Sequence, residues 1–172
     1  MSRGLGDVYK RQRLEFDSMI TLDDVIEAQK NWGEGIVAIA NAHNLGHDYV
    51  EVAQNHVESL YAYGLTKVLF KPTLASVEQF RPNFDSAMSY FVASNNECAE
   101  DKGFAIKGWN NVRFENSDII LNGETAVAMG NYFFTSPEGE EVKVEYTFGY
   151  VRDSNGFPRI QVHHSSMPAV ES

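Results

Sequence analysis

Three turn signals divide the second half of the chain into segments in which polar and apolar residues alternate. They are Asn122-Gly123, Glu138-Gly139 and Asn155-Gly156. A pair of this kind between two alternating segments is a strong signal for a β-hairpin. The alternation starts near Phe104 and continues to the terminal segment. Three successive hairpins predict four antiparallel strands in a meander.

The first half of the chain has the spacing of amphipathic helices instead. Apolar residues recur every three or four positions over residues 22–40, which predicts a long first helix. A second helix is expected from Asp48 to about Gly64, because Asp48 and Glu51 together resemble a capping box. Both helices should turn an apolar stripe towards the core.

A short strand and a third helix complete the first half. Residues 67–70 (KVLF) resemble a strand that Pro72 ends, and residues 84–92 have helical spacing after Pro82. Helices followed by an antiparallel sheet indicate an α+β fold, in which the sheet curls around the helices and leaves a pocket between them. We expect the functional site in that pocket.

The length of 172 residues fits one domain with a sizeable core. The first residues, MSRGLGDVYKRQ, have no period and resemble translated adapter sequence. We therefore expect residues 1–14 to be a non-native or disordered extension, residues 15–168 to form a single domain, and residues 169–172 to be a short tail.

Composition argues against several classes of partner. Fourteen Lys and Arg stand against 24 Asp and Glu, a net charge of −10, and no basic cluster could follow a phosphate backbone, so nucleic acid is not expected. No apolar run approaches the roughly 20 residues that cross a bilayer, which predicts a soluble protein of the cytoplasm or periplasm. Cys98 is the only cysteine, so neither an intrachain disulfide nor a Cys-rich zinc site is possible.

The last predicted strand carries polar side chains among apolar ones. Because side chains alternate along a strand, Ile160, Val162, His164 and Ser166 share one face. The apolar pair indicates that this face meets the core. His164 and Ser166 are therefore expected to point inward, where they could act on a substrate or simply hydrogen-bond each other or the backbone.

Two motifs resemble the iota-class carbonic anhydrases. They are the terminal His-His-Ser-Ser-Met-Pro at residues 163–168 and the Phe-Lys-Pro-Thr at residues 70–73. The resemblance covers nearly the whole domain. It implies a cone-shaped fold of the nuclear-transport-factor-2-like (SnoaL-like) superfamily, with three N-terminal helices packed in a curved antiparallel sheet, and usually a homodimer. It also implies the reversible hydration of CO2 to bicarbonate and a proton.

The same resemblance implies which residues are catalytic. The family's pocket threonine matches Thr73, its serine matches Ser166, its histidine matches His164, and its tyrosine matches Tyr90. In this hypothesis Thr73 and Ser166 hold the water and the bicarbonate oxygens. Tyr90 donates to the oxyanion, and His164 accepts or relays the proton.

Further residues are expected around the substrate. Trp32, Tyr61 and Phe91 would wall the pocket, although aromatic residues at helical spacing are also typical of a plain core. Lys71 could steer bicarbonate or be solvated. The family's tyrosine could also correspond to Tyr61 or to a tyrosine of another element.

A catalyst without metal has to avoid free hydroxide, because moving a proton from water to an ordinary histidine costs roughly 12–13 kcal/mol. A catalytic zinc typically needs three protein ligands. His163 and His164 face opposite sides of their strand, His43 and His47 lie either side of a helix break, and His56 is interpreted, like them, as a capping or surface residue. We expect a concerted attack of water on CO2 without a cofactor. Zinc or manganese, with which some family members are associated, is the alternative.

Two other functions remain open. An isomerase or dehydratase acting on a small hydrophobic ligand would need a base such as a buried carboxylate, and the inward faces of the last two strands carry none. A non-catalytic association module would need no polar cavity.

Overall fold

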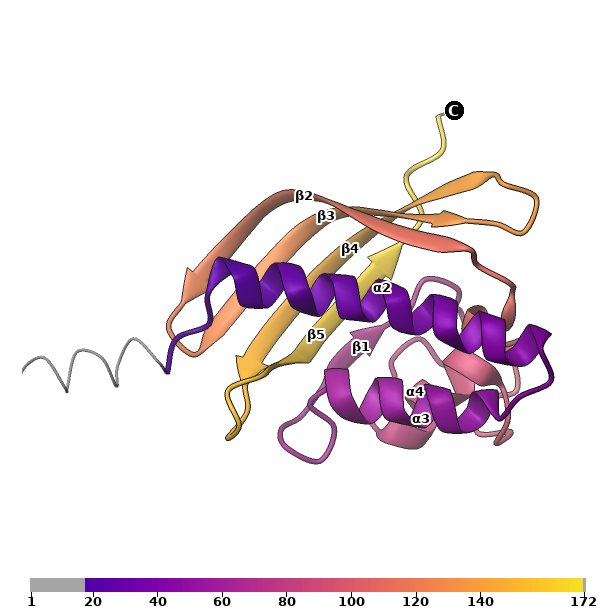
Figure 1. The fold of residues 1–172 in the computed structure, drawn as a ribbon, viewed down its shortest axis with the longest axis horizontal. Helices are drawn as coiled ribbons and strands as arrows, with labels where there is room; N and C mark the ends of the chain where they lie inside the picture. Colours follow the sequence, from indigo (N-terminus) through magenta and orange to yellow (C-terminus); the bar gives the residue numbers. More distant parts are fainter. Residues whose placement is uncertain (1–17, 172) are drawn as a thin grey trace, which may run out of the picture.

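Three α-helices lie against one face of a five-stranded sheet in the residues that the structure, a computed structural model, describes, namely 18–171 (Figure 1). The elements are, in chain order, α2 (Leu22–Asn44), α3 (Tyr49–Leu60), β1 (Leu69–Lys71), α4 (Phe84–Val92), the 3-10 helix η1 (Phe104–Ile106), β2 (Asn111–Asn122), β3 (Thr125–Thr135), β4 (Glu141–Arg152) and β5 (Pro158–Ser166). The α+β class is confirmed. The predicted extension, residues 1–14, lies outside the described residues.

Local capping signals set the helix starts where the sequence indicated them. At the start of α2, the Asp24 N–H donates to the Thr21 hydroxyl at 3.1 Å and the Asp24 carboxylate accepts from the Thr21 N–H at 2.9 Å. The end of α3 differs from the prediction, because the helix stops at Leu60. Tyr61 becomes extended there and forms a bridge with Ile160 of β5. The side chain of Tyr61 is thereby held against the sheet.

The sheet has the strand order β1-β5-β4-β3-β2. Strands β2 to β5 form the predicted antiparallel meander, and the glycines of its three turns have positive φ angles of 64°, 87° and 88°. The expectation of a wholly antiparallel sheet is wrong at one edge. There β1 pairs with β5 in parallel, with Phe70 opposite His163, which places residues 70–73 beside the end of β5.

Aromatic side chains fill the space between the helices and the inner face of the sheet. The largest fully buried side chains include Trp32, Tyr61, Phe70, Phe91, Tyr132, Phe134, Tyr146, Phe148 and Tyr150. Rings of this size dominate the energetics of a core, and several of them carry a polar atom that must find a partner. The interior therefore combines apolar walls with buried hydroxyls.

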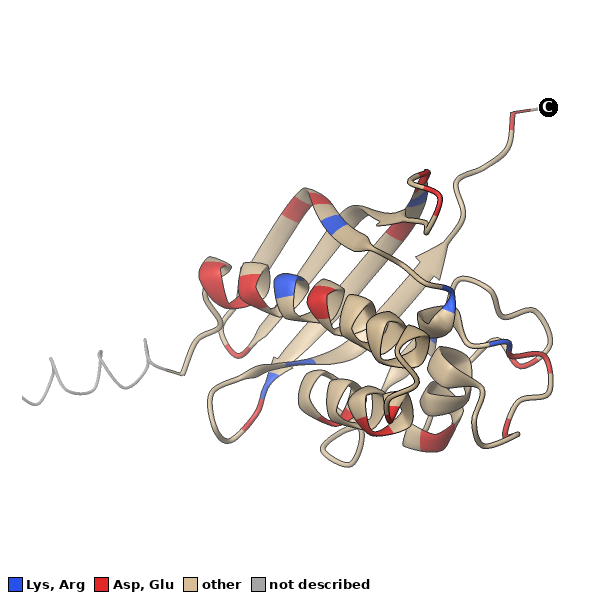
Figure 2. Cartoon of the chain, turned by 45° about the vertical axis from the view of Figure 1, so that its right-hand side comes forward, with Lys and Arg blue, Asp and Glu red and all other residues tan. Residues whose placement is uncertain are grey.

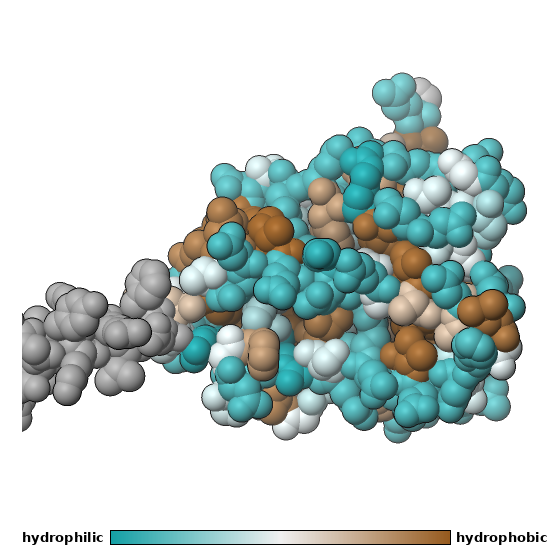
Figure 3. Space-filling view, viewed as in Figure 1, coloured by the Kyte–Doolittle hydropathy of each residue, from teal (hydrophilic) through white to brown (hydrophobic). Residues whose placement is uncertain are grey.

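Most charged residues of the described chain are spread over the outer faces of the helices, the strands and the loops, without a basic cluster (Figure 2), and the ion pair of Arg81 and Asp101 is the buried exception. The face shown in Figure 3 is mostly hydrophilic, with apolar side chains gathered beside the start of α2, where Met19, Leu22 and Ile26 are exposed. Within residues 18–171, no helix has both the length and the apolar character needed to cross a membrane.

A β-bulge in β5 reverses the faces predicted for the terminal motif. Ile160 pairs with Tyr150 and Val162 pairs with Gly149, so that Gln161 is an extra residue without a partner. The alternation shifts by one position after the bulge. His163 and Ser165 consequently point into the core, with exposed fractions of 2% and 1%.

The prediction that His164 and Ser166 point inward is therefore wrong. His164 is exposed, and the Ser166 hydroxyl donates to the Glu145 carboxylate at 3.0 Å on the outer face of the sheet. Gly149 accommodates the bulge, because a Cβ at this position would lie 2.9 Å from the Cβ of Val162.

Candidate functional site

A small cavity lies between the helices and the inner face of the sheet. Its volume is about 10 Å³, measured as the space open to the centre of a water-sized sphere, which suits a molecule of very few atoms. The lining residues come from both motifs, from the helices and from β3: Trp32, Phe70, Pro72, Thr73, Tyr90, Phe91, Phe104, Tyr132, His163 and Ser165. The lining contains no carboxylate.

Three hydroxyl groups meet at Ser165. The Ser165 Oγ lies 2.5 Å from the Thr73 Oγ1 and 2.5 Å from the Tyr132 hydroxyl oxygen, and it also contacts the Glu145 carbonyl oxygen at 3.2 Å. Thr73 follows β1, Ser165 lies on β5 and Tyr132 lies on β3, so the pairing of the strands brings the cluster together. Each hydroxyl can both donate and accept.

Tyr90 contributes a fourth hydroxyl from α4. It accepts the Leu74 N–H at 3.3 Å and also hydrogen-bonds the Thr73 side chain. Its ring stacks on Phe104, with 5.6 Å between ring centroids. Burial raises the pKa of Tyr90 to about 12. The phenol therefore stays protonated at neutral pH and can donate a hydrogen bond.

His163 lies behind the hydroxyl cluster in an aromatic cage. Its ring stacks on Phe70 at 4.6 Å between centroids and meets the edge of Phe148 at 4.3 Å. The Nδ1 atom lies 2.8 Å from the Tyr61 hydroxyl, and the Nε2 atom lies 3.2 Å from the Tyr132 hydroxyl. Burial, with smaller contributions from His164 and His56, lowers the pKa of His163 well below its usual range. The imidazole is therefore neutral.

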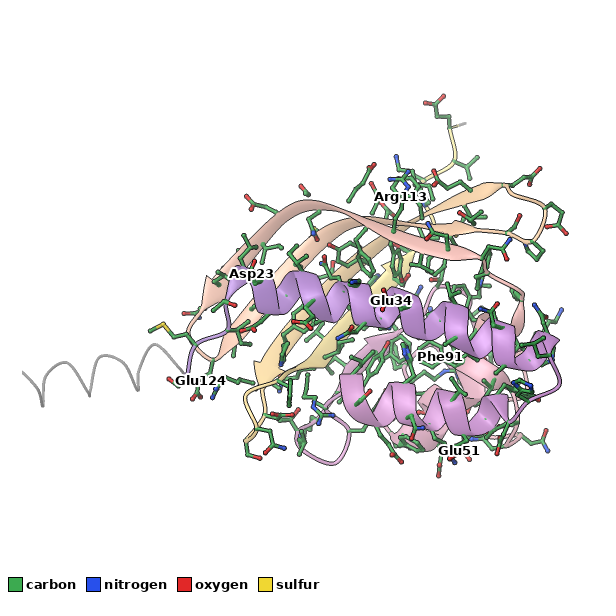
Figure 4. The ribbon with its side chains drawn as sticks, viewed as in Figure 1. Asp23, Glu34, Glu51, Phe91, Arg113 and Glu124 are labelled. Atoms are coloured by element: carbon green, nitrogen blue, oxygen red, sulfur yellow. The ribbon has the colours of Figure 1, made fainter. Side chains whose placement is uncertain are left out.

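Most of the residues implied by the resemblance converge on this cavity. Thr73, Tyr90, Trp32 and Phe91 line it directly, and in Figure 4 Phe91 is seen between α2 and α3, with the labelled carboxylates Asp23, Glu34 and Glu51 outside. Tyr61 does not line the cavity but hydrogen-bonds His163.

The Lys71 side chain lies outside the cavity. Its Nζ donates to the Ser165 carbonyl oxygen at 3.0 Å, so Lys71 holds the end of β5 in place.

Sequence reasoning missed His163, Ser165 and Tyr132. The first two were assigned to the wrong face because the bulge was not foreseen, although an isolated glycine in a strand, here Gly149, is a signal for one. Tyr132 lies on the same face of β3 as the buried Ala126, Ala128 and Phe134, but Val127 and Met129 make the other face apolar too, so the sequence alone did not show which face is inward. The position of Tyr132 opposite Ser165 depends on the order of the strands.

Within residues 18–171, no three His, Cys, Asp or Glu side chains are close enough together to hold a metal ion. His43 and His47 are exposed. His56, by contrast, was expected at the surface and is only 6% exposed, between the rings of Trp32 and Phe91.

Fold and site together define an α+β protein with a narrow cavity that is lined by hydroxyls and aromatic rings, with a neutral histidine behind them. Residues 23–167 match the family described as metal-independent carbonic anhydrase. The chain belongs to this family. The resemblance seen in the sequence and the prediction of a carbonic anhydrase are confirmed, and the family's description agrees with catalysis without a metal.

Two relatives are similar over most of their length. A metal-independent carbonic anhydrase of Nostoc sp. (strain PCC 7120) is 40% identical over 152 residues, which are 87% of this chain and 74% of that protein. The crystal structure of a cyanobacterial iota-carbonic anhydrase complexed with bicarbonate is 37% identical, with a TM-score of 0.87 over 90% of this chain and 96% of that one.

A more distant structure shares the fold alone. It is a putative calcium/calmodulin-dependent protein kinase II association domain from Xanthomonas campestris, 24% identical, with a TM-score of 0.53 over 80% of this chain and 83% of that one. An association role for the present chain does not follow from this likeness.

Proposed function

We propose that the cavity around Thr73, Tyr90, Tyr132, His163 and Ser165 is the place where this chain hydrates CO2 to bicarbonate and a proton, without a metal. The observation that carries the proposal is the meeting of three hydroxyls on the wall of a cavity of very small volume, where the Ser165 Oγ lies 2.5 Å from the hydroxyl oxygens of both Thr73 and Tyr132. In this proposal residues 15–168 form the catalytic domain.

The walls suit the substrate and the hydroxyls suit the product. CO2 is small and apolar, and the rings of Trp32, Phe70 and Phe91 offer it an apolar surface. As water attacks the carbon, negative charge develops on the oxygens of CO2. Thr73, Ser165 and Tyr90 then stabilise it as hydrogen-bond donors whose positions are already fixed. The cyanobacterial relative forms a complex with bicarbonate, which supports bicarbonate as a ligand of the present chain.

The structure disfavours an isomerase that works with a buried carboxylate. The one Asp side chain that is deeply buried near the cavity, Asp101, accepts two hydrogen bonds from the Arg81 guanidinium, at 2.6 and 2.7 Å, and a third from Ser89 at 2.6 Å. A carboxylate engaged in this way serves the structure rather than proton abstraction. Asp101 also does not line the cavity around Ser165.

The proposal is tested by stopped-flow CO2 hydration with the purified protein, before and after exhaustive chelation, with metal content quantified on the same samples. We expect activity that survives chelation and falls by about 10²–10³ in Thr73→Val, which removes one donor and keeps the side-chain shape. Activity that vanishes on chelation and returns with zinc or manganese would overturn the metal-free mechanism. Absence of activity in both states would favour a binding or association module.

We further propose a homodimer in which the outer face of the sheet is the interface. Ile120, Val127 and Met129 form an exposed apolar stripe there, on neighbouring strands β2 and β3. Sedimentation velocity should give a dimer for the wild-type protein and a monomer for Met129→Lys. A wild-type monomer at micromolar concentration would refute this arrangement.

A further inference from the structure

We propose that Trp32 fixes the direction of a buried hydrogen-bond chain that ends at Ser165, so that His163 is a hydrogen-bond donor towards the cavity and the reacting proton passes through the Ser165 hydroxyl. Trp32 is in this sense a positioning residue. The last step rests on the proposed function, whereas the direction of the chain rests on the contacts alone.

The chain starts at a group that can only donate. The Trp32 indole N–H points at the Tyr61 hydroxyl oxygen at 3.0 Å, and an indole has no lone pair with which to accept. Tyr61 is 1% exposed, and its one other polar contact is the His163 Nδ1 at 2.8 Å. The Tyr61 hydrogen must therefore point at that nitrogen, because the alternative is a buried O–H without a partner.

The direction then propagates through the imidazole. A neutral imidazole whose Nδ1 accepts a hydrogen bond carries its proton on Nε2. The His163 Nε2–H donates to the Tyr132 hydroxyl oxygen at 3.2 Å, so the Tyr132 hydrogen points towards the hydroxyls of the cavity, where the Ser165 Oγ lies 2.5 Å away and the Thr73 side chain is the other partner. Every side chain in this hydrogen-bond chain is buried. Its sense runs from the indole of Trp32 to the hydroxyl of Ser165.

The opposite sense would give His163 a different role. For the Nε2 atom to accept a proton from the cavity side, the Nδ1 atom would have to carry the hydrogen and donate it to the Tyr61 oxygen. Tyr61 would then accept from both Trp32 and His163, and its own hydrogen would have no acceptor among the described residues. The indole of Trp32 thus opposes the tautomer in which His163 is a base for the cavity.

Without a base, the proton balance closes through the serine hydroxyl. The oxygen of the water forms a bond to the carbon of CO2 as one C=O π bond breaks. One proton of the water moves to the Ser165 Oγ while the proton of that hydroxyl moves to an oxygen derived from CO2. The product is carbonic acid, which ionises to bicarbonate and a proton in solution. Ser165 ends the step as it began, and the protein retains no proton.

The direction of the chain is tested by nitrogen-15 NMR of the histidine rings in the wild-type protein near neutral pH. We expect His163 to be neutral with its hydrogen on Nε2. A hydrogen on Nδ1 would overturn the proposal, and this measurement needs neither a variant nor activity. In Trp32→Phe, the second tautomer should become populated, since Tyr61 is free to accept from His163.

The matched control is Trp109→Phe. The indole of Trp109 is also buried, but it donates to the Phe104 carbonyl oxygen at 2.9 Å and has no contact with Tyr61. The Trp109→Phe variant should therefore leave the tautomer of His163 unchanged. Equal tautomer populations in Trp32→Phe and in the wild-type protein would refute the role of Trp32.

The proton route has a kinetic test of its own. If His163 were the base, each turnover would leave an imidazolium that must lose its proton to buffer, and kcat would rise with buffer concentration. The serine relay predicts an unchanged kcat when the buffer is raised tenfold at constant ionic strength and pH. A kcat that increases with buffer concentration would refute the proton relay through Ser165. Absence of CO2 hydration would refute the proposed function and leave the tautomer assignment standing.

Discussion

The two neighbouring serines of the terminal motif allow a sharp test of the bulge in β5, through the variants Ser165→Ala and Ser166→Ala. Ser165 is 1% exposed, and its Oγ receives or makes two hydrogen bonds of 2.5 Å. Removing it takes away the buried partner that lies 2.5 Å from both the Tyr132 and the Thr73 hydroxyl, which costs about 1–3 kcal/mol of unfolding free energy. For a domain of this size each kcal/mol lowers the Tm by roughly 2–4 °C.

The same change removes a donor from the cavity, and the loss of one such donor lowers kcat by about 10²–10³. Ser166 has the same chemistry on the opposite face, where its hydroxyl contacts only the Glu145 side chain. Ser166→Ala should stay within about 0.5 kcal/mol of the wild-type protein and keep its activity. Stopped-flow hydration and thermal unfolding measure both variants. A Ser166→Ala variant that loses as much activity as Ser165→Ala would refute the bulged register.

Three further predictions concern stability. Burial lowers the pKa of His56 to about 3 and that of His163 well below its usual range, whereas both histidines protonate near pH 6.5 in the unfolded chain. The free energy of unfolding should therefore fall below pH 6.5 by about 1.4 kcal/mol per pH unit for each of the two histidines. His56→Leu should remove one of these two contributions, as measured by urea unfolding at several pH values. A Cβ on Gly35 would lie 2.0 Å from the His56 Nδ1, so Gly35→Ala should destabilise the protein by about 1–3 kcal/mol. The loss should be smaller when His56 is also replaced by Ala. Additive losses in the double variant would contradict a clash between these two residues. Asp101→Asn should lower the free energy of unfolding by about 3–5 kcal/mol, because it leaves the fully buried Arg81 charge without its partner. Glu141→Gln, in the exposed pair with Arg113, should lower it by less than about 1 kcal/mol. Similar losses in the two variants would argue against a buried charge at Arg81.

Local interactions made part of this fold predictable from the sequence. The start of α2 is set by Thr21 and Asp24, three positions apart, and the hairpins by glycines that adopt positive φ. Such features need only neighbouring residues. The site depended on contacts between distant residues: the extra Gln161 is accommodated because Gly149 leaves room for Val162 across the sheet.

The aromatic positions show the same division. Trp32 and Phe91 were expected at the pocket from the resemblance to the carbonic anhydrases, and both line the cavity. The hydrogen bond between Trp32 and Tyr61 was not foreseen, because it depends on where α3 ends and on the bridge between Tyr61 and Ile160. Residue types near the site were readable from the sequence, but their partners were not.

In the His-His-Ser-Ser motif each residue type occurs at two adjacent positions, which makes the residue types in the cavity independent of the bulge in β5. If Gln161 were paired in the ladder without a bulge, the end of the strand would slide by one position and His164 and Ser166 would turn inward in place of His163 and Ser165. The cavity would still receive one imidazole and one hydroxyl. A slip by one position replaces the functional side chains of most active sites by others of different type, whereas here the cavity keeps the same residue types with or without the bulge.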